Sequence, residues 1–185
     1  MTRVAGPAAM VGRQNALHVI QGQYAVSADP DAVICTLLGS CVACCLRDPV
    51  LGAGGMNHFL LPDGQGSDSL SYGVNAMELL INELLRMGAR RERLQAKLFG
   101  GGRLINGLSD IGQKNGDFAK HFLENEGIAW TGGSLGGTSA RRIEFWPVSG
   151  RARQNVVDRA DEIFKTETRA NRLPAPEPAG GLELF

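Results

Sequence analysis

Short apolar runs separated by turn-forming residues make up most of the chain, and such runs are typical of β-strands. The pattern predicts strands over 17–26, 33–37, 41–46, 54–61, 97–99, 128–130, 142–148 and 156–157. Glycine, proline and aspartate lie between the runs, as in the turn at Asp48-Pro49. Most strand-to-strand links are therefore short turns, which favours a sheet in which successive strands lie close together.

Two segments have the three- and four-residue spacing of an amphipathic helix. The first begins near Ser69 or Ser71, either of which can cap it, and ends before Gly88. Its apolar stripe consists of Ala76, Met77, Leu80, Ile81, Leu84 and Leu85. The second helix is expected over about 115–126, with two phenylalanines four residues apart and a glycine after its last turn. Both stripes require a sheet to pack against.

Strands outnumber helices, so we expect an α+β fold. Its form would be a layered α/β sandwich with a mixed, largely antiparallel sheet and two or three helices. The chain has 185 residues, and a compact chain of that length buries roughly 70% of its unfolded surface without help from disulfides or metals. We expect a single domain over 16–165, a flexible leader over 1–15 and a disordered tail over 166–185.

Charge and hydropathy exclude several classes of protein. The 19 basic and 19 acidic residues give a formal net charge of +0, which argues against binding to nucleic acid or to anionic lipid. No window reaches the roughly 18 uninterrupted apolar residues of a membrane span. The first fifteen residues have no long apolar stretch typical of a signal peptide. We therefore expect a cytoplasmic protein with no membrane insertion.

Four cysteines lie close together, at positions 35, 41, 44 and 45. A disulfide framework closes loops across a chain, so this clustering predicts free thiols instead. The segment 41–44 spells CxxC, a pattern found in metal and redox sites. On a strand, however, Cys41 and Cys44 face opposite sides, while Cys41 and Cys45 stand about 13 Å apart. We therefore expect no metal site.

Cys41 is the strongest candidate nucleophile, because it follows Gly39-Ser40 at a tight bend between two apolar runs. A free thiol with a pKa near 8.5 is only about 3% ionised at pH 7, and lowering that pKa to about 6.5 takes about 2.7 kcal/mol, which one close imidazolium supplies. His58, on the next predicted strand, is the candidate partner, and a half-buried structural histidine is the alternative. We assign His18 and His121 to surface or packing roles.

Glycine-rich segments occur at FGGG (99–102) and GGSLGG (132–137). Neither continues into a phosphate-binding pattern, so we expect turns in both places. Arg141-Arg142 is expected to be a solvated pair ahead of a strand, and Ser40 either contacts a substrate or satisfies the bend.

Two longer motifs are recognisable. LLGSCVACCLRD (37–48) followed by GGMNHFLLPD (54–63) resembles the CheD family, the chemoreceptor glutamine deamidases of bacterial chemotaxis. Later blocks resemble that family in the same order: KLFGGG (97–102), IGQKN (111–115) and a segment over 136–145. The resemblance covers roughly residues 18–160.

The resemblance implies a cysteine hydrolase that converts receptor glutamines to glutamates and releases ammonia, with methyl-ester hydrolysis as a related activity. Its cysteine falls on Cys41, its histidine on His58 and its threonine on Thr36, although a one-residue shift would place Cys35 in the position of the threonine. Backbone N–H groups around Gly39 and Ser40 would hold the oxyanion. This chemistry needs neither a metal nor an organic cofactor, and the implied fold is similar to toxin-type cysteine deamidase domains.

The implied substrate is the cytoplasmic helical bundle of a chemoreceptor, and we expect an open, shallow active site at a sheet edge to receive it. A CheC-type phosphatase is a conditional partner, to which no segment is assigned. Two other functions are weighed against the deamidase. One is a non-catalytic module that binds and regulates a chemotaxis phosphatase, and the other is a general thiol amidase or peptidase.

Overall fold

A computed structural model describes residues 2–5, 15–62, 67–104 and 110–157, which form two sheets and two α-helices. The six-stranded sheet has the spatial order β1 (Thr2–Ala5), β3 (Tyr24–Ser27), β6 (Ala53–Asn57), β5 (Val42–Asp48), β7 (Gln95–Gly100), β8 (Ala129–Leu135). The four-stranded sheet has the order β10 (Ala152–Val157), β9 (Ala140–Phe145), β4 (Val33–Leu38), β2 (Ala16–His18). The helices are α1 (Ser67–Arg86), α2 (Ile111–Asn125) and a short 3-10 turn, η1 (Arg91–Arg93).

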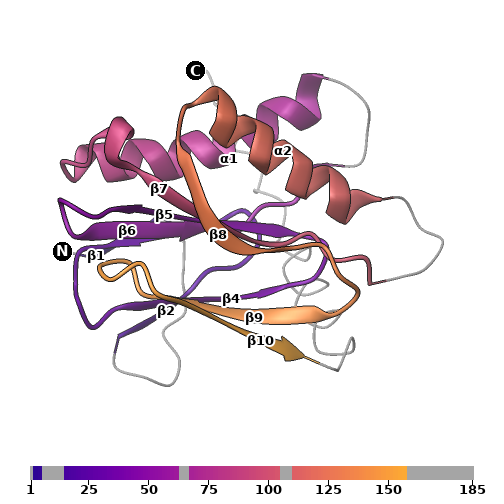
Figure 1. Cartoon of the computed structure of the whole chain (residues 1–185), viewed down its shortest axis with the longest axis horizontal. Coiled ribbons are helices and arrows are strands. Elements are labelled where there is room, and N and C mark those ends of the chain that lie inside the picture. The colour runs from indigo at the N-terminus through magenta and orange to yellow at the C-terminus, as the bar shows by residue number, and fades with distance from the viewer. Residues whose placement is uncertain (1, 6–14, 63–66, 105–109, 158–185) are drawn as a thin grey trace, which may run out of the picture.

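The elements form three layers. Both α-helices cover one face of the six-stranded sheet, and the four-stranded sheet packs against the other face (Figure 1). Among the described strands, β7–β8 and β2–β4 pair in parallel and all the other pairs are antiparallel. The predicted α+β sandwich with a mixed, largely antiparallel sheet is confirmed. No helix within the described ranges has the length and apolarity to cross a membrane.

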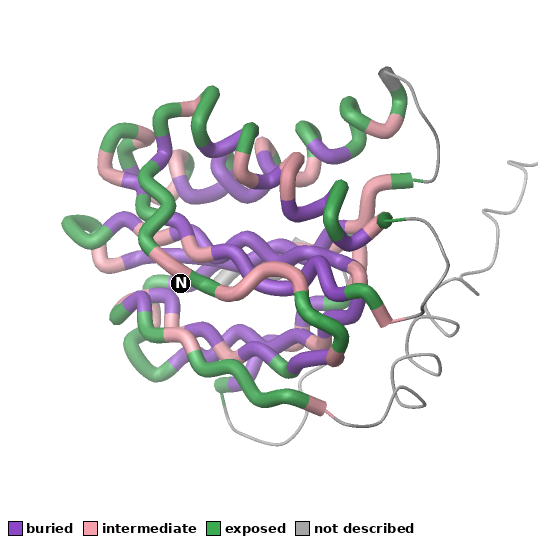
Figure 2. The backbone as a smooth tube through the Cα atoms, turned by 45° about the vertical axis from the view of Figure 1, so that its right-hand side comes forward, coloured by how far each residue is buried: buried purple, intermediate pink, exposed green. Residues whose placement is uncertain are grey.

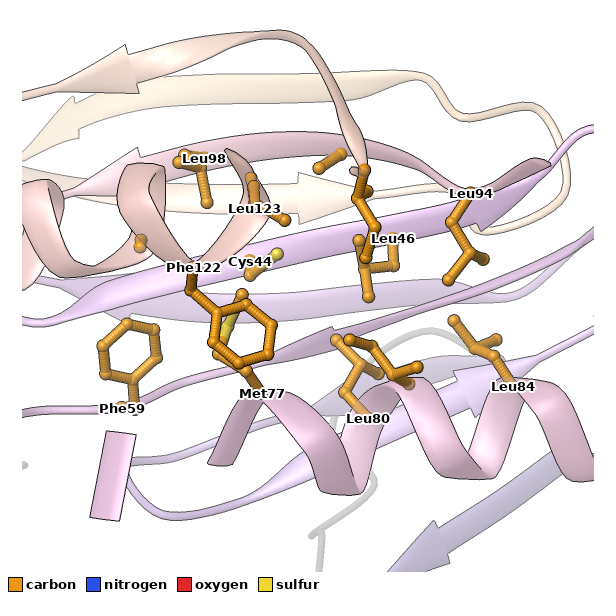
Figure 3. Packing of buried hydrophobic residues seen from close by; sticks show 14 of the residues in the cluster. Cys44, Leu46, Phe59, Met77, Leu80, Leu84, Leu94, Leu98, Phe122 and Leu123 are labelled. Atoms are coloured by element: carbon orange, nitrogen blue, oxygen red, sulfur yellow. The ribbon is translucent and has the colours of Figure 1, made fainter. Parts of the chain in front are cut away.

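Two hydrophobic cores separate the layers, and the central strands are buried on both sides (Figure 2). The helix-side core contains the apolar stripe of α1 and the face of β5 that carries Cys44 and Leu46 (Figure 3). The inter-sheet core contains the opposite face of β5, with Ala43 and Cys45, and also Cys41 just before the strand. Successive residues of an extended chain face opposite sides, so Cys44 lies in one core and Cys41 and Cys45 in the other, as predicted. Because Cys41 faces one core and Cys44 the other, the two thiols do not meet as a CxxC site requires.

Several element boundaries differ from the prediction. The single strand predicted over 17–26 is wrong: it is two strands, β2 and β3, which belong to different sheets. A turn at 21–22 lies between them, and Gly22 has a φ of 83° there. An alternating pattern is the same for a strand in either sheet, so the pattern alone did not reveal the break. Helix α2 also begins four residues earlier than predicted, at Ile111.

The GGSLGG segment is not a turn throughout, because Gly132–Leu135 continues strand β8. A Cβ at Gly133 would lie 1.9 Å from the Leu98 carbonyl oxygen, so this close pairing with β7 requires glycine. Within the segment expected to be a leader, Thr2–Ala5 pairs with β3 as the edge strand β1. The expected tail over 166–185 lies outside the described residues.

Candidate active site

Cys41 lies where the chain crosses from one sheet to the other. Strand β4 ends at Leu38 in the four-stranded sheet, Gly39 and Ser40 form a bend, and β5 begins at Val42 in the six-stranded sheet. The Cys41 side chain is fully buried in the inter-sheet core. The bend predicted from Gly39-Ser40 therefore holds the thiol between the two sheets.

His58 follows β6 and is brought to Cys41 by an isolated bridge. Val42 and Phe59 exchange two backbone hydrogen bonds of 3.0 and 2.9 Å across this bridge, and both side chains belong to the helix-side core. Their neighbours Cys41 and His58 consequently lie on the opposite, inter-sheet face as diagonal cross-strand neighbours. Diagonal partners have Cα atoms about 7–8 Å apart, a separation that long side chains span.

Thr36 completes the group. Its Oγ1 lies 2.8 Å from His58 Nδ1 and donates to the Val19 carbonyl oxygen at 2.7 Å. Thr36 sits between Ile34 and Leu38, whose side chains are in the inter-sheet core, whereas the adjacent Cys35 faces the other side of β4. Of the two residues that the sequence left as alternatives, Thr36 is the one that the structure places on His58.

The hydrogen bonds favour one tautomer of His58. Since the Thr36 hydroxyl donates its hydrogen to Val19, its oxygen accepts from His58 Nδ1–H, and we assign the neutral imidazole a free lone pair at Nε2. Nε2 is buried and has no hydrogen-bond partner among the residues the structure describes. Burial lowers the pKa of His58 to about 4, against the opposing hydrogen bond to the Val19 carbonyl.

That pKa changes the role expected for His58. An imidazolium was expected to stabilise a Cys41 thiolate, but a pKa of about 4 leaves His58 neutral at pH 7. The arrangement suits a neutral base that accepts the thiol proton as the sulfur attacks. Burial raises the pKa of the Cys44 and Cys45 thiols, which makes neither of them a competing nucleophile.

The carbonyl groups of the cysteine bend are held from three directions. Gly102 N–H donates to Gly39 O at 2.9 Å and Gly101 N–H donates to Cys41 O at 2.8 Å. The side-chain amide of Asn115, on α2, donates to Ser40 O at 3.0 Å. The FGGG segment, expected to be only a turn, therefore packs directly on the candidate nucleophile.

Glycine is required where this loop touches the bend. Gly100 and Gly101 have φ values of 106° and 64°, a left-handed conformation that other residues rarely adopt. A Cβ at Gly100 would also lie 2.1 Å from the Cys41 carbonyl oxygen. The close approach of the two chain segments thus depends on this glycine.

Arg141, on β9, holds the second glycine-rich segment at the same end of the sheet. Its guanidinium donates to the Ser134 carbonyl at 3.0 Å and also to Gly136 O, while Gly136 N–H donates to Gly100 O at 2.9 Å. Arg141 is only 5% exposed, so the expected solvated pair is wrong for Arg141 and right only for its exposed neighbour Arg142. Both glycine-rich segments meet at the bend that carries Cys41.

The site is closed rather than open. Cys41 is 0% and His58 4% exposed, so the expected shallow, open cleft at a sheet edge is wrong. Gln21 lies in the turn between β2 and β3, and its Oε1 is 3.8 Å from the Cys41 thiol. Gln21 is therefore one of the residues that cover the Cys41 thiol.

Asn115, Arg141 and Gln21 were not identified as site residues from the sequence. Asn115 had a detectable signal, because it shares a helix face with Ala119 and Phe122, both buried and apolar. A polar residue on an apolar face needs hydrogen-bond partners, so its position indicates that it bonds to groups in the layer beneath the helix. Arg141 and Gln21 carry no such signal in the sequence.

His121 is exposed and His18 partly buried, in line with the surface or packing roles assigned to them.

Comparison with known proteins gives one consistent family. The family model described as CheD chemotactic sensory transduction matches residues 60–155. A protein of Acidiphilium cryptum (strain JF-5), named a probable chemoreceptor glutamine deamidase CheD, is 53% identical over 193 residues and covers 100% of both chains. A protein of the same name from Caulobacter sp. (strain K31) is 56% identical over 176 residues, which cover 91% of this chain and 92% of that one.

Similarity to solved structures is lower. A Neisseria meningitidis protein described as DUF152 matches with a TM-score of 0.43 and 13% identity, over 68% of this chain and 65% of that one.

Proposed function

This chain belongs to the CheD family, and from that membership we propose that it is a chemoreceptor glutamine deamidase, a protein-glutamine glutaminase. It hydrolyses the side-chain amide of receptor glutamines to a carboxylate and releases ammonia. The observation that supports the proposal is that Cys41, His58 and Thr36 lie together between the two sheets of a chain with this family similarity.

In the first half of the reaction, the Cys41 sulfur attacks the amide carbon while His58 Nε2 takes the thiol proton. The carbonyl oxygen becomes an oxyanion, which accepts hydrogen bonds from backbone N–H groups at Gly39, Ser40 and Cys41. When the C–N bond breaks, the imidazolium donates its proton to the departing nitrogen, so that ammonia leaves and a thioester remains.

In the second half, water replaces ammonia. His58, neutral again, takes a proton from the water as its oxygen attacks the thioester carbon, and then returns a proton to the sulfur as the C–S bond breaks. The net change is one amide and one water converted to one carboxylate and one ammonium ion. Thr36 and the Val19 carbonyl keep Nδ1 protonated, so that Nε2 remains the working base.

The substrate is the cytoplasmic helical bundle of a receptor, which places the protein in the cytoplasm. A glutamine side chain that protrudes from such a bundle enters beside Gln21 and displaces that side chain from the thiol. Hydrolysis of glutamate methyl esters would use the same thioester with methanol as the leaving group. A CheC-type phosphatase is a further candidate partner.

The test is mass spectrometry of a receptor cytoplasmic fragment co-expressed with the protein. Wild type should raise the mass by about 1 Da for each glutamine converted, and Cys41→Ala should abolish the change. Cys45→Ala is the matched control, because Cys45 is a buried thiol of the same inter-sheet core, four residues further along the chain. A folded wild type that leaves several receptors unchanged, or a Cys41→Ala variant that still converts them, would contradict the proposal.

A further inference from the structure

Asn115 connects the two chain segments that carry the candidate catalytic residues. Its side chain is 0% exposed, in the first turns of α2. The Nδ2 group donates to the Ser40 carbonyl at 3.0 Å, and Oδ1 accepts the Leu61 N–H at 2.8 Å. One buried amide therefore joins the residue before Cys41 to the segment that follows His58.

The bond to Ser40 determines the direction of the next backbone N–H. The Ser40 carbonyl and the Cys41 N–H belong to the same peptide group, and every described peptide bond is trans, so the two point in opposite directions. Asn115 draws the carbonyl toward the helix layer. The Cys41 N–H is thereby turned toward the inter-sheet side, where the Cys41 side chain lies.

The flanking peptide groups have little freedom to compensate. Gly102 holds the Gly39 carbonyl and Gly101 holds the Cys41 carbonyl, as described above. Of these three hydrogen bonds, only the one from Asn115 is made by a side chain. A substitution at Asn115 therefore removes this bond and leaves both glycines unchanged.

We propose that Asn115 is a positioning residue that aims the Cys41 backbone N–H at the oxyanion of the deamidation reaction. Its second bond, to Leu61, keeps the His58 segment in place relative to the cysteine bend. This inference rests on the proposed function, because it assigns a group to the oxyanion of that reaction. Asn115 itself does not touch the substrate.

Two substitutions separate the two bonds. Asn115→Asp retains an oxygen that accepts the Leu61 N–H but replaces the donor to Ser40 with a second oxygen, which repels the carbonyl. Asn115→Ala removes both bonds. Gln113→Glu is the matched control, because it makes the same amide-to-carboxylate change at an exposed position of the same helix.

Each variant is measured for ammonia release from a receptor fragment, for alkylation of Cys41 by iodoacetamide and for thermal unfolding. Alkylation forms a carbon–sulfur bond with loss of iodide and creates no oxyanion, so it reports on the thiol and His58 alone. For Asn115→Asp we expect kcat to fall by about a hundredfold, as when one oxyanion donor is lost, with KM and the alkylation rate unchanged. For Asn115→Ala we expect both rates to fall, and for Gln113→Glu neither.

The outcomes are distinguishable. Wild-type activity retained in Asn115→Asp would overturn this inference alone, and so would a parallel loss of kcat and alkylation in a folded Asn115→Asp protein. Absence of ammonia release from folded wild type would overturn the proposed function and this inference with it.

Discussion

Acidification should destabilise the folded protein through His58. The pKa of this histidine is about 4 in the folded state and 6.5 in an unperturbed one, and the cause is burial of the imidazole. Between these two values the unfolded chain binds more protons than the folded one. The stability is therefore fully present above about pH 6.5 and is lost as the pH falls toward 4. The loss reaches about 2 kcal/mol at pH 5 and about 3 kcal/mol at pH 4.

The assay is urea unfolding at pH 8 and pH 5, followed by tryptophan fluorescence, for wild type and His58→Gln. Between these pH values wild type should lose about 2 kcal/mol more than the variant, because glutamine does not titrate. His18 and His121 are present in both proteins and cancel. Asp48, with a pKa of about 2, titrates below this range. Equal losses in the two proteins would refute the reasoning, because they would mean that His58 is as easily protonated when folded as when unfolded.

Three further predictions concern single side chains. Thr36→Val should lower kcat for ammonia release by about 10- to 100-fold, because His58 loses the acceptor that holds its tautomer, and Thr36→Ser should retain most activity; equal kcat for both variants would contradict this role. Asp48→Asn should lower the free energy of unfolding in urea by about 3 kcal/mol at pH 7. Burial opposes ionisation of the Asp48 carboxylate, and its ion pair with Arg93, at 2.7 Å, offsets that cost. A change near zero would show that the pair contributes nothing. Gln21→Ala should raise the rate of Cys41 alkylation by iodoacetamide, and an unchanged rate would show that Gln21 does not cover the thiol.

Local patterns in the sequence predicted those features of helices and strands that depend only on residues close together in the chain. The apolar stripe of α1 and its end near Gly88 follow from spacing within a single helix. The division of the cysteines between two faces follows from the two-residue period of strand β5 alone. The same locality explains the bend at Gly39-Ser40.

Relations between distant segments were not predictable in this way. Whether residues 17–26 form one strand or two depends on which sheet each half joins, and both sheets impose the same alternation. The sequence predicted only turns for the glycine-rich loops, because the contacts that require glycine, such as Gly100 against Cys41 O, are made with another part of the chain. Asn115 meets Ser40 across 75 positions for the same reason.

The sequence by itself determined the chemistry available to this protein: a cysteine at a tight bend, a histidine on the next strand, and motifs that identify a family. Only the tertiary structure decided how these groups are arranged. It placed Thr36 rather than Cys35 on His58, buried the imidazole so that it is neutral at pH 7, and covered the thiol. Tautomer, protonation state and access depend on which atoms from other segments surround a side chain, and that is set by the packing of the two sheets.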